Sequence, residues 1–274
     1  MKLPAVALLL VGCASLAIAA PRDESRYVLL TAPGQHLFES SPLGNGRLGA
    51  AIYGGVAEER IVLNESGMWS GSPQDADRHD AHQALPEIRR LLLEGKNHEA
   101  EALVNANFTC AGKGSGFGAG ANVPYGSYQT LGDLRLKFIG IDASAPFANY
   151  RRTLDLAEAT ARVSFEQGGV HFVREGFVSQ PGEVFVLRLS ADQKGKLSFD
   201  ATLARRERAT IESAGAAGLV MHGQLNDGYN GTDGVRYAAR LEVRATGGTV
   251  NIAENTVCEA ELALSDVMQG EIVV

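Results

Sequence analysis

The amino-acid sequence predicts an all-β protein, an antiparallel sandwich or barrel, with one small helical hairpin inserted near residues 85–107. Three observations support this prediction. Short apolar runs bounded by Gly, Pro, Ser or Asn occupy the chain on both sides of that insertion, as β-strands do. Helical periodicity occurs only in the insertion. The 32 glycines in 274 residues indicate many turns and few long helices.

The N-terminal segment "MKLPAVALLLVGCASLAIAAPRD" predicts export. One lysine is followed by an apolar run too short to span a bilayer, as in a signal peptide. Ala17-Ile18-Ala19 fits cleavage after residue 19, which leaves residues 20–274 as one domain. Leu10-Val11-Gly12-Cys13 resembles a bacterial lipobox, in which Cys13 would be lipidated. Both alternatives place the protein in the periplasm, on the outer membrane as a lipoprotein or outside the cell, with membrane contact only through a lipid anchor.

The first strands are expected between Tyr27 and Asn64, in the runs "YVLL", "RLGAAIY" and "ERIVLN". The pattern then becomes helical, and we expect helices over residues 85–94 and 97–107. Pro86 suits the first turn of a helix, Gly95 suits its C-terminal cap, and Asn97 suits the N-cap of the next helix.

A glycine-rich loop, "CAGKGSGFGAGANVPYGSYQ", separates the hairpin from the remaining strands, and such a loop often borders a site. From about Thr130 the alternation is nearly continuous and predicts a series of short strands. Their sequences are "LGDLRLKFIG", "YRRTLDLAEA", "TARVSFEQGG", "VHFVREGFVSQP", "EVFVLRLSA", "KLSFDATLAR", "GLVMHGQL", "VRYAARLEVRATGG" and "TVNIAEN".

The stretch "PLGNGRLGAAIYGG", residues 42–55, contains the G-x-G-x-x-G spacing of a dinucleotide-binding turn. That motif requires a buried strand before the first glycine and a helix after the third. Pro42 precedes the glycines, only "AAIY" separates Gly49 from the next glycine, and no βαβ alternation follows. We therefore interpret Gly44-Asn45-Gly46 as a turn that leads into a strand.

Composition excludes one class of partner and leaves the cysteines undecided. The net charge of −7 and pI of about 5.4 argue against nucleic-acid binding, which needs a basic face. Cys110 and Cys258 have no C-x-x-C partner, so they form either a disulfide or two free thiols. The histidines lack metal-site spacing, and neither a metal nor another cofactor is expected. The histidines considered for such a site are four of the six in the chain: His36, His79, His82 and His98.

A series of motifs carries a more specific signal. "PLGNGRLGAAIYGG" is followed by "EERIVLNESGMWSG", then by "YGSYQTLGDL", "YRRTLDLAEATARVSF" and "VREGFVSQPGEVFVLRLSA". From about Tyr27 to about Leu264 this series resembles the N-terminal domain of glycoside hydrolase family 95, the inverting α-L-fucosidases and related α-L-galactosidases. The resemblance implies a large β-sandwich of the supersandwich type and an oligosaccharide or glycan substrate.

In that family a helical barrel follows the sandwich and supplies the catalytic carboxylates. This sequence stops at "ELALSDVMQGEIVV", near the expected junction, so we expect a truncated chain that lacks its helical catalytic partner. No catalytic residue is therefore assigned. The alternative interpretation is a stand-alone carbohydrate-binding or adhesive β-sandwich lipoprotein.

The segment "LNESGMWSGSPQD" holds the best candidates for contact with a sugar at the border of such an active site. Trp69, the only tryptophan, could stack on a sugar ring, while Asn64 and Glu65 could bond its hydroxyls. Alternatively, Trp69 fills the sandwich core, and Asn64 and Glu65 order the turn through backbone hydrogen bonds. Further candidates from the motif segments are Arg47, Tyr128 and Gln129.

An inverting glycosidase needs an acid and a base carboxylate separated by roughly 6.5–9.5 Å. Candidate carboxylates are Glu65, Asp75, Glu158 and Asp200. Nothing in their spacing brings two of them together, and each also fits a solvated surface position. The sequence thus predicts no hydrolysis by this chain alone.

Overall fold

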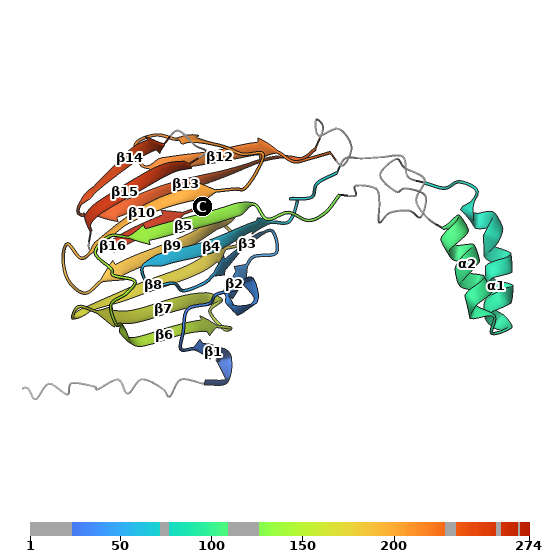
Figure 1. Cartoon of the computed structure of the whole chain (residues 1–274), viewed down its shortest axis with the longest axis horizontal. Helices are drawn as coiled ribbons and strands as arrows, with labels where there is room; N and C mark the ends of the chain where they lie inside the picture. Colours follow the sequence, from blue (N-terminus) through green and yellow to red (C-terminus); the bar gives the residue numbers. More distant parts are fainter. Residues whose placement is uncertain (1–23, 72–76, 109–125, 228–233, 256–258, 268) are drawn as a thin grey trace, which may run out of the picture.

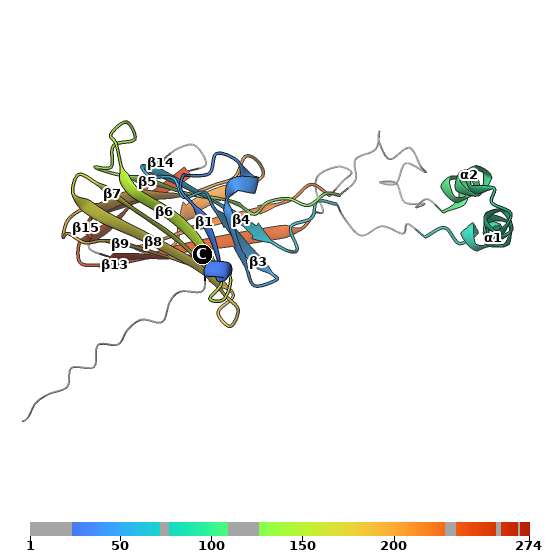
Figure 2. The same cartoon turned by 90° about the horizontal axis from the view of Figure 1, so that it is seen from below.

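Two large antiparallel sheets face each other and form a β-sandwich (Figures 1 and 2). The computed structural model describes residues 24–71, 77–108, 126–227, 234–255, 259–267 and 269–274. The predicted signal peptide and lipidation site, Asp75, Cys110 and Cys258 lie outside the described residues. The all-β prediction is confirmed, and the sandwich replaces the barrel alternative.

The larger sheet has nine strands, and each pairs with its neighbours in antiparallel fashion. In spatial order they are β1 (Tyr27–Leu30), β6 (Ala148–Asp155), β7 (Thr160–Gln167), β8 (Val170–Ser179), β9 (Val184–Ala191), β16 (Gln269–Val273), β13 (Arg236–Thr246), β12 (Gly218–Gln224) and β11 (Thr210–Ser213).

The smaller sheet has seven strands and is also antiparallel. In spatial order they are β14 (Thr249–Asn255), β15 (Glu259–Val267), β10 (Leu197–Ala204), β5 (Gly132–Phe138), β4 (Glu58–Glu65), β3 (Leu48–Ile52) and β2 (Ser41–Gly44). Short 3₁₀ turns lie outside the sheets: η1 (Glu24–Arg26), η2 (Leu37–Glu39) and η3 (Ala81–Ala84).

Every strand expected from the alternation is present, and the structure adds β2, β11, β15 and β16. Strand β2 contains Pro42, which cannot donate a hydrogen bond to a neighbouring strand. It lies at the edge of the smaller sheet, the position where a sheet tolerates proline.

The core lies between the two sheets because each strand turns its apolar positions inward. Strand β10 alternates strictly, and its inward side chains Leu197, Phe199, Ala201 and Leu203 are at most 2% exposed. In β8 the same face carries Gly176, because a side chain there would meet the Cδ1 of Ile52 at 2.7 Å. Burial of these apolar faces is the main favourable contribution to folding.

The helical hairpin consists of α1 (Leu85–Leu93) and α2 (Asn97–Asn107), which confirms its predicted position. Pro86 lies in the first turn of α1. The C-terminal end of α1 is a Schellman motif, because Gly95 N–H donates to Leu92 O and Lys96 N–H donates to Leu91 O. Gly95 has the left-handed φ of +73° that this motif requires.

The predicted N-cap of α2 is wrong by one residue. Asn97 is the first helical residue, and Lys96, already fixed by the Schellman motif, takes the N-cap position without a side-chain cap. The two helices bury Ile88, Leu91 and Ala100 against each other, and both views draw the hairpin apart from the sheets (Figures 1 and 2). Among the described residues, no helix combines the length and apolarity needed to cross a membrane.

A buried ion pair joins the two sheets. Arg174 on β8 and Glu59 on β4 are 3% and 2% exposed, and Nη1 of Arg174 lies 3.3 Å from Oε2 of Glu59. The guanidinium also stacks on the ring of Phe138 at 3.8 Å. Burial raises the pKa of Glu59 and lowers the pKa of Arg174 to about 10, so the guanidinium stays charged at neutral pH.

The same arginine holds the loop between β3 and β4. Its guanidinium donates hydrogen bonds to the carbonyl oxygens of Gly55 and Val56. Tyr150 on β6 donates to Gly54 O at 2.7 Å, and the Gly54 N–H donates to Glu59 Oε1 at 2.8 Å. Side chains from both sheets thereby satisfy the backbone groups of this loop, as burial of a loop requires.

We expect Arg174→Met to lower the free energy of unfolding by about 3–5 kcal/mol, because it leaves a buried carboxylate without its counter-charge. The control is Arg162→Met, which removes a half-exposed arginine paired with Glu175 at 3.5 Å on the outer face of the same sheet. Its cost should stay below about 1 kcal/mol. Urea denaturation measures both values, and equal losses would contradict the assignment of Arg174 as the structural bridge.

Candidate functional site

The glycine-rich stretch from residue 42 to residue 55 forms the hairpin between β2 and β3. The Oδ1 atom of Asn45 accepts from the N–H of Arg47 at 2.9 Å and from the N–H of Leu48 at 2.8 Å. Gly46, between Asn45 and Arg47, has a φ of +94°, a left-handed conformation that glycine adopts without strain. The turn interpretation is confirmed, and no helix follows the third glycine to hold a pyrophosphate.

This hairpin places Arg47 between two carboxylates at one end of the sandwich. Its Nε lies 3.2 Å from Oε1 of Glu65 on β4, and its Nη1 lies 2.8 Å from Oε2 of Glu183. The hydrogen bond that Arg47 donates to Glu65, and then the negative charge of Glu183, raise the pKa of Arg47. Because Glu183 belongs to the turn between β8 and β9, the arginine links the ends of both sheets.

An aromatic pair lies beside these charges. Trp69 and Tyr128 form an isolated antiparallel bridge, with ring centroids 5.5 Å apart in an edge-to-face arrangement. The two residues are 53% and 44% exposed. The Trp69 alternative of a core-filling side chain is therefore wrong. Its neighbour Met68, which is 1% exposed, occupies the core instead.

The hydroxyl of Tyr128 lies within hydrogen-bond distance of two acceptors. The hydroxyl of Tyr128 donates to Oδ1 of Asn64 at 3.3 Å and to the backbone oxygen of Glu65 at 3.4 Å. Burial, and then the charge of Glu65, raise the pKa of Tyr128, so the phenol remains a donor at neutral pH. Glu65 Oε2 accepts from the N–H of Gly67 at 2.7 Å, which confirms its turn-ordering role.

We call Asn64, Glu65, Trp69 and Tyr128 the aromatic shelf. Arg47 contacts it through Glu65, and Gln129 follows Tyr128 in the chain. The N–H of Gln129 donates to Met68 O at 2.7 Å, which fixes the two segments side by side. The structure thus brings together all the residues that the sequence selected as sugar-contact candidates, although their role remains a prediction.

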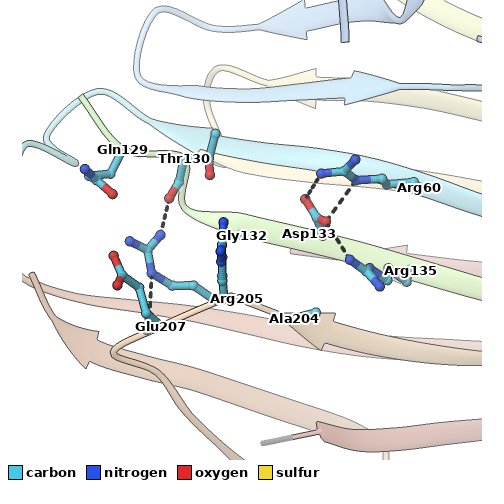
Figure 3. A pocket seen from close by; sticks show the side chains of 10 residues that line it. Arg60, Gln129, Thr130, Gly132, Asp133, Arg135, Ala204, Arg205 and Glu207 are labelled. Atoms are coloured by element: carbon cyan, nitrogen blue, oxygen red, sulfur yellow. Dashed lines mark hydrogen bonds and ion pairs between the residues drawn. The ribbon is translucent and has the colours of Figure 1, made fainter. Parts of the chain in front are cut away.

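Two hollows adjoin the shelf. One, of about 390 Å³, is lined by Arg47 and Glu65 together with apolar residues that include Leu48 and Val184. The other, of about 510 Å³, lies on the outer face of the smaller sheet, with Gln129 in its lining (Figure 3). Concave surfaces that combine apolar walls with a few polar groups are typical of ligand sites.

The three candidate carboxylates that the structure describes lie on different parts of the sandwich. Glu65 belongs to the shelf, Asp200 lies on β10 opposite Lys137, and Glu158 is exposed in the turn between β6 and β7. Within the described residues, no group of three metal-binding side chains converges.

Sequence reasoning missed several charged residues near the shelf. Glu183 follows a Pro-Gly turn, and its partner Arg47 lies 136 positions away, so spacing gave no indication of the pair. The arginines of the second hollow come from β4, from β5 and from the segment that follows β10. The run "ARRERA", residues 204–209, was the one local signal available, because it places consecutive charges at the end of a strand.

The fold is a β-sandwich domain, and its shelf presents an exposed aromatic pair beside hydrogen-bonding groups. The chain belongs to the family described as glycosyl hydrolase family 65, N-terminal domain, whose sequence model matches residues 28–271. This establishes a glycoside hydrolase N-terminal domain.

Curated relatives are α-fucosidases by name. "Alpha-L-fucosidase 2" of Arabidopsis thaliana is 35% identical over 246 residues, which are 83% of this chain and 28% of that protein. "Probable alpha-fucosidase A" of Aspergillus niger is 30% identical over 66% of this chain and 22% of its own length. The Aspergillus oryzae protein of that name is 24% identical over 67% of this chain and 23% of its length.

We expect Trp69→Ala to lower the free energy of unfolding by only about 1 kcal/mol, the worth of one aromatic pair. The neighbouring change Met68→Ala should cost about 2–5 kcal/mol, because it leaves a cavity in the core. Urea denaturation compares the two variants. A Trp69 variant as unstable as the Met68 variant would return the tryptophan to a core role.

Proposed function

We propose that this domain contacts the glycan substrate of a fucosidase-type glycoside hydrolase of family 95. In such an enzyme terminal α-L-fucosyl or α-L-galactosyl linkages are hydrolysed with inversion, and a helical barrel supplies the catalytic carboxylates. The observation that carries the proposal is the exposed pair Trp69 and Tyr128, flanked by the hydrogen-bonding groups of Asn64, Glu65 and Arg47. The fucosidase names of the curated relatives support the choice of sugar.

The chemistry of the shelf fits a deoxy sugar. An aromatic face packs against the C–H groups of a pyranose ring and its methyl group, which removes apolar surface from water. Amide, carboxylate and guanidinium groups at the side of the ring bond the hydroxyls in specific directions. The shelf places both kinds of group together, while no two candidate carboxylates in the described chain are placed for acid–base catalysis.

We expect the chain to bind 2′-fucosyllactose with low affinity, but more tightly than it binds lactose. Binding should change the fluorescence of its single tryptophan, which a titration measures. Tyr128→Ala should weaken binding by roughly tenfold, because it removes one face of the shelf and the donor to Asn64. The matched control is Phe38→Ala, which removes an aromatic ring that is 86% exposed elsewhere.

Calorimetric titration extends the comparison to Trp69→Ala, which lacks the fluorescent probe. Equal affinity of the Tyr128 and Phe38 variants would refute the role of the shelf. We also expect no release of fucose from 2′-fucosyllactose or an aryl α-L-fucoside by this chain alone. Turnover that Glu65→Ala abolishes would instead make the chain a catalyst in its own right.

We further propose that the protein is exported, on the basis of its N-terminal segment. Mass spectrometry of the mature protein decides between the two processing sites. A first residue Ala20 is the expected result for ordinary signal cleavage. A lipid-modified Cys13 would support the lipoprotein alternative, and an intact Met1 would contradict export.

A further inference from the structure

The second hollow beside the shelf is a groove on the outer face of the smaller sheet, with a volume of about 510 Å³ (Figure 3). We call it the arginine groove. Its lining comes from β4, β5, the segment before β5, and the end of β10 with the residues that follow it. The residues are Arg60, Gln129, Thr130, Gly132, Asp133, Arg135, Ala204, Arg205, Arg206 and Glu207.

One carboxylate positions two of the arginines. Asp133 on β5 is 9% exposed, and its oxygens lie 2.9 Å and 3.2 Å from Nε and Nη2 of Arg60. The Oδ2 atom also accepts from Nη2 of Arg135 at 3.2 Å, so that one buried anion holds two cations (Figure 3). Each guanidinium keeps further N–H groups beyond those that bind Asp133.

A third arginine is fixed from the opposite wall. The Arg205 guanidinium donates to the backbone oxygens of Thr130 and Glu207, and it lies over the ring of Tyr237 at 5.0 Å. The adjacent Arg206 is exposed and forms no hydrogen bond or ion pair with the part of the chain that the structure describes. The groove therefore combines three arginines held by hydrogen bonds, Arg60, Arg135 and Arg205, with the solvated guanidinium of Arg206.

The charge of the groove is opposite to that of the chain. Its lining contains four arginines against Asp133 and Glu207, whereas the whole chain has a net charge of −7. Guanidinium groups bind carboxylate and sulfate oxygens through paired hydrogen bonds. A basic depression on an acidic protein therefore favours an anionic ligand.

The groove continues from the shelf. Asn64 and Arg60 lie on the same outward face of β4, because residues four apart in a strand point the same way. Tyr128 belongs to the shelf, and the next residue, Gln129, lines the groove. A saccharide that stacks on Trp69 and Tyr128 can therefore extend its next residue toward the arginines.

We propose that the arginine groove binds an acidic group, a carboxylate or a sulfate ester, on a glycan whose neutral part contacts the aromatic shelf. The inference rests on the proposed function for the neutral part and goes further by naming the chemical class of the glycan. The positioned donors of Arg60 and Arg135 would hold the acidic group, and Arg206 would close over it from the end of β10.

The test titrates the chain with three probes: neutral 2′-fucosyllactose, a galacturonate trisaccharide and a sulfated L-fucose trisaccharide. We expect at least one acidic probe to bind roughly tenfold more tightly than the neutral one, with an affinity that falls as salt increases. Preference for the galacturonate or for the sulfated probe identifies which acidic group the groove accepts.

Variants locate the site. Arg135→Gln and Arg206→Gln change exposed side chains and should each weaken binding of the preferred acidic probe by roughly tenfold, with little effect on the neutral probe. The matched control is Lys196→Gln, which removes one exposed positive charge just before the opposite end of β10. It should leave all affinities unchanged.

The outcomes separate this inference from the proposed function. Binding of the neutral probe through Tyr128 without preference for an acidic probe would overturn the inference and leave the shelf intact. Acidic binding that needs the arginines but not Tyr128 would support the groove and count against the shelf. Equal losses of affinity for the acidic probe in the Arg206 and Lys196 variants would mean that net charge alone explains the binding. That result would overturn the proposed site in the groove.

Discussion

The ion pair between Arg174 and Glu59 is the constraint on which the arrangement of the sandwich depends. Isolating either charge in an apolar core costs several kcal/mol, so the two sheets must meet in the one register that pairs them. The same guanidinium binds the carbonyl groups of Gly55 and Val56, which fixes the loop from β3 to β4. Both strands run from this loop to the candidate site, which inherits its geometry from the buried pair.

The site lies where the strands end and the two sheets are joined again, this time by exposed groups. Arg47 reaches Glu183 of the larger sheet, and the amide of Asn45 donates to Ser179 O at 3.2 Å. Exposed ion pairs of this kind contribute little stability but hold side chains in a defined direction. The shelf can therefore present Trp69 and Tyr128 to solvent without weakening the core, because Met68 fills the space below.

Local pattern predicted most elements but not their partners. Alternation identified most of the strands, although it missed the nine-residue β15, and Pro86 with Gly95 delimited α1. Strand β2 escaped prediction because Pro42 is tolerated only at an edge, and edge position follows from sheet order. In β8 the alternation places Arg174 among inward apolar residues, yet nothing local reveals that Glu59 lies opposite, since 115 positions separate them.

The sequence by itself determined the all-β class, the hairpin, the turn character of residues 44–46 and the segments that contain the candidate residues. Its motif series also indicated a fucosidase-related glycoside hydrolase domain. Only the tertiary structure decided that Trp69 is exposed, that the candidates form one shelf and that arginines from three parts of the chain share a groove. The physical reason is the sequence separation of the residues involved. Alternation and turn residues reflect interactions between near neighbours in the chain, whereas burial and charge pairing depend on which distant strands the sheets bring together.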